Sequence, residues 1–365
     1  MRKIKLKLLC LLLVPFALFL HYLFSIYPHA SESFYSLTLN KAFIQSLSKI
    51  TGLFPFSLSE LLIYGIVPLC VSYIIYILWR LYKDTKSWHK ILLHFILNTL
   101  AALSILYFLF MSMWGFNYLR PHFGETIGID ITKHSTFELA ELYTYLIEET
   151  NHLSEQTSRD KDGYMVITNG YRSVFERAHL GYNEAAKLFP SLAGNYGRPK
   201  PILTSEVMNY TGIAGIYFPF TAEANVNISV LDLSIPATTM HEMAHQRGYA
   251  NEDEANFIAF VTCKLHPDID FKYSGYLLAL THTAQALAQD NPSLLQELNR
   301  NLSKHVIEDI GRNHAFWKQY EGKVENISSK MNDAYLKVNG ISDGTKSYGR
   351  MVDLLLGYYT VYVKE

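Results

Sequence analysis

Three long segments of the chain contain no Asp, Glu, Lys or Arg. They contain 24, 19 and 29 residues and lie between Lys7 and Glu32, between Glu60 and Arg80, and between Lys90 and Arg120. A helix needs about 20 apolar residues to cross the hydrocarbon core of a bilayer, so each segment is long enough. We therefore predict that the chain sits in a lipid bilayer through three transmembrane helices, at about residues 8–27, 61–79 and 91–114.

The positive charges beside these segments predict their orientation. Four basic residues precede the first segment and four connect the second to the third, whereas only two connect the first to the second. Lys and Arg favour the cytoplasmic side of a membrane. We therefore expect a multi-pass protein of the cell membrane, with its N-terminus in the cytoplasm and everything after Arg120 outside it. The alternative is a cleaved signal peptide, but the first apolar segment is longer than such peptides need, and no clear A-x-A site follows.

The chain divides into two parts of opposite charge. Residues 1–119 hold 10 Lys and Arg and 3 Asp and Glu, whereas residues 120–365 hold 22 and 30. We expect a membrane domain over 1–119 and one extracytoplasmic domain over 120–365, a length that suits a single domain. Because the acidic part offers no basic stripe for phosphates, a nucleic-acid partner is not expected.

The outer part has the pattern of an α+β domain. Ser135 and Glu138 have the spacing of a capping box, which predicts the start of a helix. Short β-rich runs with Gly and Pro breaks occupy the region from Pro201 to Leu231, where 225–230 alternates apolar and polar residues and predicts a half-buried strand. From Pro236 onward the pattern is mostly helical. We predict helices, a small β-sheet and then more helices.

One motif in this domain indicates chemistry. His241, Glu242 and His245 form H-E-x-x-H. Two histidines four residues apart lie on one face of a helix and can bind one Zn²⁺, and the glutamate beside them can reach a water on the metal. Pro236 suits the first turn of such a helix and Gly248 suits its end. The alternative is a helix with two surface or hydrogen-bonded histidines, which the context makes less favoured.

A third protein ligand is expected in the acidic stretch that follows. The candidates are Asn251, Glu252, Asp253 and Glu254. On a helix that restarts at Glu252, Glu254 shares a stripe with three apolar residues, and a carboxylate on a buried stripe needs a cation or hydrogen-bond donors. Glu252 shares its face with smaller residues and has a more peripheral position. We therefore predict that His241, His245 and Glu254 bind the metal.

These residues carry a resemblance. His241-Glu242-x-x-His245, Gly248 and the run from Glu252 to Phe257 resemble the gluzincin superfamily of metallopeptidases. The layout is also similar to a bacterial family known as domain of unknown function 3810, which combines N-terminal membrane spans with an extracytoplasmic H-E-x-x-H domain. The resemblance implies a zincin-like fold and a metallopeptidase-like site. It does not supply a substrate.

The expected function is that of a membrane-anchored zinc metallopeptidase that hydrolyses peptide bonds. Glu242 is expected to act as the general base, and the substrate to be a peptide or a protein. One rival is a catalytically silent sensor or envelope-assembly protein, in which a fourth protein ligand such as Asn251 or Asp253 would close the site. Another is a transport component, but the three spans have few polar residues for a pathway.

Several further residues are weaker candidates. Glu223, on the strand before the motif, could bind a substrate amine, orient a ligand or pair with a basic residue at the surface. The groups that could polarise a scissile carbonyl, each also explained by packing, are Tyr273, Tyr276, His282, Tyr348 and Arg350.

Overall fold

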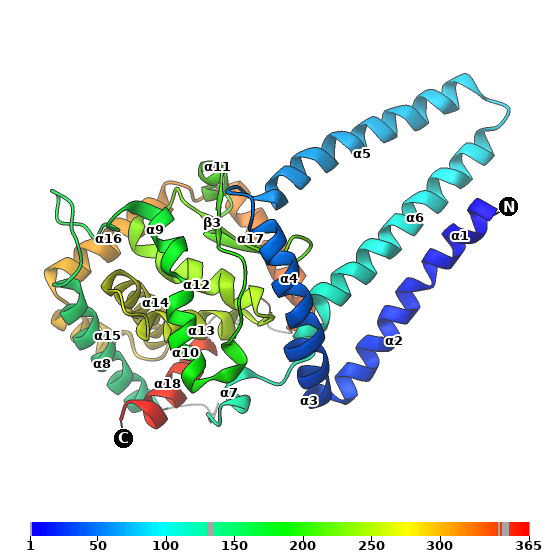
Figure 1. Cartoon of the computed structure of the whole chain (residues 1–365). Helices are drawn as coiled ribbons and strands as arrows, with labels where there is room; N and C mark the ends of the chain where they lie inside the picture. The colour runs from blue at the N-terminus through cyan, green and yellow to red at the C-terminus, as the bar shows by residue number, and fades with distance from the viewer. Residues whose placement is uncertain (1, 130–134, 342–343, 345–349, 365) are drawn as a thin grey trace.

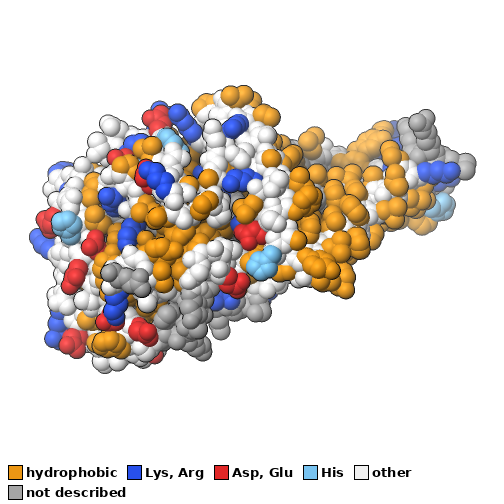
Figure 2. Space-filling view, turned by 60° about the horizontal axis from the view of Figure 1, so that its bottom comes forward, with side chains coloured by type: hydrophobic (Ala, Val, Ile, Leu, Met, Phe, Trp, Pro, Cys, Tyr) orange, Lys and Arg blue, Asp and Glu red, His pale blue; other side chains and the backbone are white. Residues whose placement is uncertain are grey.

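The computed structural model describes residues 2–129, 135–341, 344 and 350–364. An arm of long helices projects from a rounded body of shorter helices (Figure 1). Apolar side chains cover much of the arm, whereas Lys, Arg, Asp and Glu gather on the body (Figure 2). This body contains the described part of residues 120–365 and is called the outer domain below.

The arm contains three helical segments long and apolar enough to cross a membrane. They are Ile4–Ile26, formed by α1 (Arg2–Leu11) and α2 (Leu13–Ile26), then α5 (Leu58–Lys83) and α6 (Trp88–Met113). The predicted set of three apolar helices is confirmed, and it indicates a membrane protein. The second and third helices are longer than predicted because both continue into their charged flanks.

The three spans are packed unequally. Phe16 in α2 stacks on Phe108 in α6, with ring centroids 6.0 Å apart. Asn98 in α6 donates a hydrogen bond of 3.0 Å to the Tyr73 hydroxyl in α5. From there α5 and α6 diverge toward the outer domain (Figure 1). The most apolar stretch of α5 has no side chain buried by the described residues, which leaves it to contact lipid.

The segment between the first and second spans packs on the outer domain. It forms α3 (Pro28–Ala30), the π-helix η1 (Ser31–Asn40) and α4 (Lys41–Thr51). Ser48 Oγ accepts a hydrogen bond of 3.0 Å from the Gly197 amide, and Thr51 Oγ1 donates one of 2.9 Å to the Thr221 carbonyl. A boundary at 119/120 therefore separates, in sequence, two parts that lie together in space.

Helices make up most of the outer domain, and the capping box of Ser135 and Glu138 begins one of them as predicted. The α-helices are α7 (Phe123–Thr126), α8 (Thr136–Ser154), α9 (Gly170–Arg177), α10 (His179–Leu188), α11 (Ser205–Asn209), α12 (Ile235–Gln246), α13 (Glu252–Lys264), α14 (Ile269–Asp290), α15 (Pro292–Leu298), α16 (Lys304–Lys318), α17 (Lys323–Val338) and α18 (Met351–Tyr362). Short 3₁₀ turns within the described residues are η2 (Gly115–Leu119), which leads into this domain, and η3 (Pro190–Leu192), η4 (Asp232–Ser234) and η5 (Asn299–Asn301) inside it. The core centres on α12, α13 and α14, and α13 is buried over most of its surface.

A three-stranded sheet packs against α12. Its strands are β1 (Lys200–Ile202), β2 (Gly215–Phe218) and β3 (Glu223–Asn227), in the order β1-β3-β2. β3 runs parallel to β1 and antiparallel to β2, where Tyr217 pairs with Ala224. The predicted combination of a mostly helical domain with a small sheet is confirmed.

The central strand is more buried than the sequence predicted. Every residue of β3 is buried, including Asn225 and Asn227 on the face expected to meet solvent. Asn227 Nδ2 donates a hydrogen bond of 2.7 Å to Asn209 Oδ1, and Asn225 Nδ2 donates to the Ile216 carbonyl at 3.3 Å. Neighbouring segments therefore bond these amides, so the polar face need not reach water.

Glu223 at the start of β3 holds the second span. Its carboxylate accepts hydrogen bonds from the amides of Leu58 and Ser59, at 3.2 and 2.9 Å, in the first turn of α5. The ammonium group of Lys200 lies 3.6 Å away, and both charged side chains are buried. A carboxylate at a helix N-terminus satisfies amides that have no partner inside the helix. Of the predicted alternatives for Glu223, the structure supports pairing with a base, here in the interior.

Replacing Glu223 by Gln should loosen this junction. The change leaves Lys200 buried without its carboxylate, and breaking one side of a buried ion pair costs about 3–5 kcal/mol. We expect a large fall in the free energy of unfolding of the full chain in detergent, measured by thermal or denaturant melting. Glu206→Gln, at an exposed position in α11, is the matched control. Equal stability of the two variants would contradict this role.

Candidate metal centre

Helix α12 brings the two motif histidines together. It has Pro236 in its first turn, and Gly248 beyond its end adopts a φ of 81°, a left-handed conformation that suits glycine. The Nε2 atoms of His241 and His245 are 3.0 Å apart. His245 is buried and His241 is partly exposed, so both rings point to one place at the edge of the core.

Glu252 completes the cluster. The chain turns after α12 and starts α13 with Glu252 as its first residue. One carboxylate oxygen of Glu252 lies 3.1 Å from His241 Nε2 and 3.6 Å from His245 Nε2. The potential ligand atoms of these three residues all lie within 4.8 Å of one another. Glu252, for which the sequence predicted a more peripheral position than for Glu254, is the carboxylate beside the histidines.

The prediction that Glu254 lies beside the histidines is wrong. Glu254 is two positions beyond Glu252 on α13, a rotation of about 200°, so it faces the other side of the helix. Its carboxylate accepts hydrogen bonds from the Phe123 amide and from Asn251 Nδ2, and lies 3.4 Å from His122 Nδ1. A carboxylate on this buried stripe does need partners, and for Glu254 these are two hydrogen-bond donors and a histidine.

The three side chains fit the requirements of a zinc site. Zinc binds imidazole nitrogen and carboxylate oxygen at about 2.0–2.2 Å, which separates tetrahedral ligand atoms by about 3.3 Å. The separations of 3.0, 3.1 and 3.6 Å lie around that value. His241, His245 and Glu252 could therefore hold a metal ion by their converging atoms.

A hydrogen bond fixes the orientation of the His245 ring. His245 Nδ1 lies 2.7 Å from the carbonyl oxygen of Tyr249, an arrangement in which Nδ1 carries the proton and Nε2 faces Glu252. Burial alone would lower the pKa of His245, but the Glu252 carboxylate raises it to about 9. Burial would raise the pKa of Glu252, and the histidines reverse this and hold it well below its usual range. Each pKa shift thus has the other residue as a cause, the mark of a pair of opposite charges between the buried His245 and the partly exposed Glu252.

Glu242 lies beside this cluster and against strand β2. Its side chain is so close to Gly215 that a Cβ atom there would lie 2.5 Å from Glu242 Oε1. Its Oε2 atom is buried without a hydrogen-bond partner among the described residues. Burial raises the pKa of Glu242 to about 7, although both histidines act to lower it. A carboxyl with a pKa near neutrality can both accept and donate a proton.

The strand next to Glu242 lies at an edge of the sheet. β2 is the last strand in the order β1-β3-β2, so among the described strands it pairs on one side only. The side chain of Ile216 in β2 is exposed, whereas Tyr217 is buried. An unpaired strand edge can bind an extended peptide through main-chain hydrogen bonds.

Aromatic residues that the sequence did not single out for the site form one of its walls. Trp114 directly follows α6, and its ring lies 5.6 Å from the His245 ring in an edge-to-face contact. Trp114 Nε1 donates a hydrogen bond of 2.9 Å to the Tyr335 hydroxyl, and Tyr118 donates to the same oxygen at 3.4 Å. The Glu252 charge helps to raise the pKa of both tyrosines, after the larger effect of burial. The signal in the sequence was the aromatic run from Trp114 to Tyr118 at the end of the third uncharged segment.

The remaining predicted residues have different surroundings. Burial lowers the pKa of His282 to about 4, and the nearby His241 adds to this effect. The His282 ring is therefore neutral near pH 7. Tyr273 donates a hydrogen bond of 2.6 Å to Asp309, and Tyr276 is bonded to Tyr145. Arg350 lies 3.3 Å from Asp253, which removes that carboxylate from the cluster. Tyr348 lies outside the described residues.

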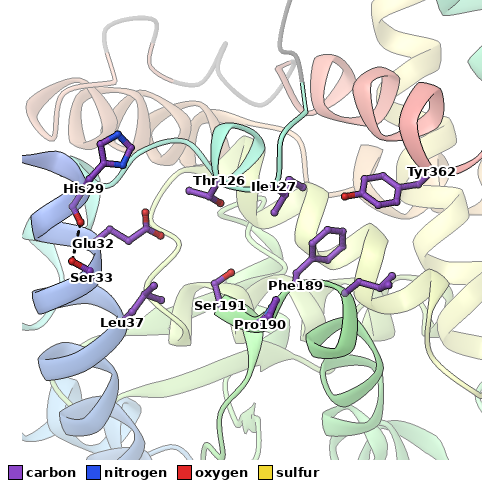
Figure 3. A pocket seen from close by; sticks show the side chains of 11 residues that line it. His29, Glu32, Ser33, Leu37, Thr126, Ile127, Phe189, Pro190, Ser191 and Tyr362 are labelled. Carbon is purple, nitrogen blue, oxygen red and sulfur yellow. Dashed lines mark hydrogen bonds between the residues drawn. The ribbon is translucent and has the colours of Figure 1, made fainter.

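A separate hollow lies on another part of the surface. It has a volume of about 460 Å³ and lies between η1 and the region around Phe189 and Tyr362 (Figure 3). Glu32, on its wall, is already paired with the buried Arg120 at 2.9 Å. None of the three clustered ligands or Glu242 lines this hollow, so it is distinct from the candidate metal centre.

The contact between His122 and Glu254 predicts a pH-dependent contribution to stability. The hydrogen bond to Glu254 raises the pKa of His122 to about 9, against the effect of burial. A raised pKa adds stability below the ordinary value near 6.5, and this is lost as the pH rises through 9. The His122 side chain is 41% exposed, so the effect should stay within about 1 kcal/mol. Melting curves should show wild type more stable than His122→Gln at pH 6, with the gap closing by pH 9.5; a constant gap would contradict this.

Comparisons with known proteins give one match. Neither a curated protein nor a solved structure matches the chain. A family profile matches residues 35–356, which include α5, α6, the sheet, the three clustered ligands and Glu242. The chain therefore belongs to the family described as protein of unknown function (DUF3810).

Proposed function

We propose that this protein is a membrane-anchored, zinc-dependent metallopeptidase. The observation that carries the proposal is the convergence of His241, His245 and Glu252, with Glu242 buried beside them. Two histidines from one helix and a carboxylate from the next form the ligand set of many catalytic zinc sites. The resemblance of the motif to gluzincins and the adjacent edge strand support the same reading.

In the proposed mechanism, three residues would bind the metal and a fourth would transfer protons. His241, His245 and Glu252 would hold Zn²⁺, which in such a site lowers the pKa of water toward about 7 and polarises a carbonyl. Glu242 would take the proton of the attacking water and pass it to the leaving amine. The unpartnered Oε2 and the pKa of about 7 suit both steps, because the carboxyl can exchange a proton near neutral pH.

Strand β2 supports a peptide as the substrate. β2 contacts Glu242 at Gly215 and its outer edge is unpaired among the described strands, so a peptide bound there in extended form would lie close to the metal ligands. Peptide-bond hydrolysis fits this arrangement better than hydrolysis of a compact small molecule.

The side of the membrane follows from charge. The basic residues before the first span and between the second and third favour the cytoplasm. With three spans, the outer domain and its candidate site would then be extracytoplasmic. The experiment that tests the proposed function is cleavage of a peptide library by the purified full chain, which Glu242→Gln should abolish.

The alternative is a sensor or assembly protein in which zinc is structural or turnover has been lost, and a closed site with a fourth protein ligand would favour it. Asn251 Nδ2 donates to Glu254, and Asp253 faces Arg350. Neither side chain joins the three clustered ligands in the described residues. A position open to water and substrate is what distinguishes a catalytic zinc site from a structural one.

A further inference from the structure

Helix α17 has an apolar stripe that the protein leaves exposed. Five side chains spaced three or four residues apart share one face of the helix, and each is at least 40% exposed: Val324, Ile327, Met331, Tyr335 and Val338. Leu336, on a different face, is buried and anchors the helix to the outer domain. A helix of a soluble domain normally turns such a stripe toward the core. Here the stripe needs another apolar environment.

The beginning of α17 lies close to the second membrane span. Tyr320, just before α17, packs edge-to-face on Tyr210, which follows α11, with ring centroids 5.0 Å apart. The segment that leads into α11 is bound to α5, because Thr204 Oγ1 accepts a hydrogen bond of 2.8 Å from Tyr64 and donates one of 2.6 Å to Glu60. These contacts connect the start of α17 with the first two turns of α5.

The end of α17 lies against the third membrane span. Tyr335, a member of the apolar stripe, accepts a hydrogen bond from Trp114 and packs on Phe110, with ring centroids 6.5 Å apart. Phe110 belongs to the last turn of α6, inside the apolar segment. The C-terminal part of the stripe therefore lies beside the last turn of α6, at the end of that span. Figure 1 shows α17 on the side of the outer domain from which α5 and α6 project.

Other exposed apolar side chains lie on elements near the start of α5. They belong to the segment after β1, to α11 and its end, and to β2: Leu203, Val207, Tyr210 and Ile216. Leu203 is held at the first turn of α5, because its amide donates a hydrogen bond of 2.8 Å to Glu60, and Tyr210 packs on Tyr320 just before α17. Exposed apolar side chains gathered near membrane-spanning helices favour a membrane contact.

We propose that α17 is a membrane-surface helix whose apolar stripe inserts into the bilayer leaflet nearest the outer domain. Lipid is the occupant because the stripe meets the membrane-spanning helix α6 where Tyr335 packs on Phe110, and because the start of α17 is connected to the first turns of α5. Lys323 and Lys330 lie along one side of the stripe, where ammonium groups can reach lipid phosphates while their stems cover apolar surface. Lys337, which pairs with Asp333 at 2.6 Å, continues the same row. A helix with these features lies in the plane of the interface.

This placement also bears on the substrate. Trp114 and Tyr335 connect α17 to the wall of the metal centre, so the site lies at the membrane surface rather than far from it. The inference about substrate rests on the proposed function: the polypeptide cleaved would be one that lies along the bilayer surface, such as the part of a membrane-anchored protein next to its anchor.

The test is photo-crosslinking of the full chain in vesicles of phosphatidylethanolamine and phosphatidylglycerol. The photoreactive residue p-benzoylphenylalanine is placed in the stripe, as Ile327→p-benzoylphenylalanine or Met331→p-benzoylphenylalanine. Matched controls carry it at Asn326 or Ser329, which lie on other faces of α17. Mass spectrometry should find several-fold more lipid adduct from the stripe positions than from the controls. Equal melting temperatures show that all four variants fold.

Two outcomes would overturn the proposal. Equal lipid adducts from the stripe and control positions would show that the stripe does not enter the bilayer. Crosslinks between two copies of the chain as the main product at Met331 would assign the stripe to a dimer contact. The readout requires neither zinc nor hydrolysis, so its failure is distinguishable from failure of the peptidase proposal.

Discussion

Replacing Glu252 by Gln should remove most of the zinc affinity, whereas replacing Glu254 by Gln should leave it largely intact. Glu252 lies 3.1 and 3.6 Å from the two histidine nitrogens, while Glu254 is occupied by the Phe123 amide and Asn251. A neutral amide is a poor zinc ligand, so we expect a loss beyond the about 10–100-fold typical of residues that only orient a ligand. Competition with a chromophoric chelator measures the affinity of each variant.

The two variants control for each other. Both remove one negative charge from the first turn of α13, so a general effect of charge on that helix would appear in both. Glu254→Gln is expected to lower stability because its carboxylate is buried with three partners, and melting curves will show whether it folds. A folded Glu254→Gln chain without zinc, beside a Glu252→Gln chain that retains it, would contradict the assignment of Glu252 as the third ligand.

Replacing Glu242 by Gln should abolish peptide hydrolysis while zinc remains bound. Glutamine keeps the shape of the side chain and cannot take the proton of an attacking water. A positioned general base contributes about 100- to 10,000-fold to a rate, so cleavage should fall by at least that factor. The measurement compares cleavage of a peptide library with zinc content for the same preparation of the full chain.

Two controls make this result specific. Glu206→Gln, exposed in α11, should cleave as wild type does. Wild type treated with a chelator should lose cleavage and regain it when zinc is added. Undiminished cleavage by Glu242→Gln would remove the proposed mechanism even if zinc is present.

The parts of the fold that the sequence predicted are those set by local pattern. The three apolar helices follow from uncharged segments, and α12 follows from Pro236, the motif and Gly248. Helix spacing alone also places His241 and His245 on one face. Each of these features depends on residues within one segment, so no long-range contact could change it.

The incorrect predictions concern side chains whose surroundings depend on segments far away in the sequence. Whether Glu252 or Glu254 faces the histidines depends on the path of the turn between α12 and α13, and the partner of Glu254 is the amide of Phe123, which lies 131 positions earlier in the chain. Trp114 likewise meets His245 across a long sequence separation. The sequence therefore contained no sign that α12 lies beside the end of α6, a contact that the fold brings about.

The most direct test of the central claim is the zinc content of the purified full chain, measured by elemental analysis after supply of zinc and removal of loosely bound metal. We predict about one zinc per chain, the stoichiometry of a single site with three protein ligands. We also predict that His245→Ala, which removes one ligand, loses that zinc. A folded wild-type chain that holds no zinc under these conditions would contradict the account.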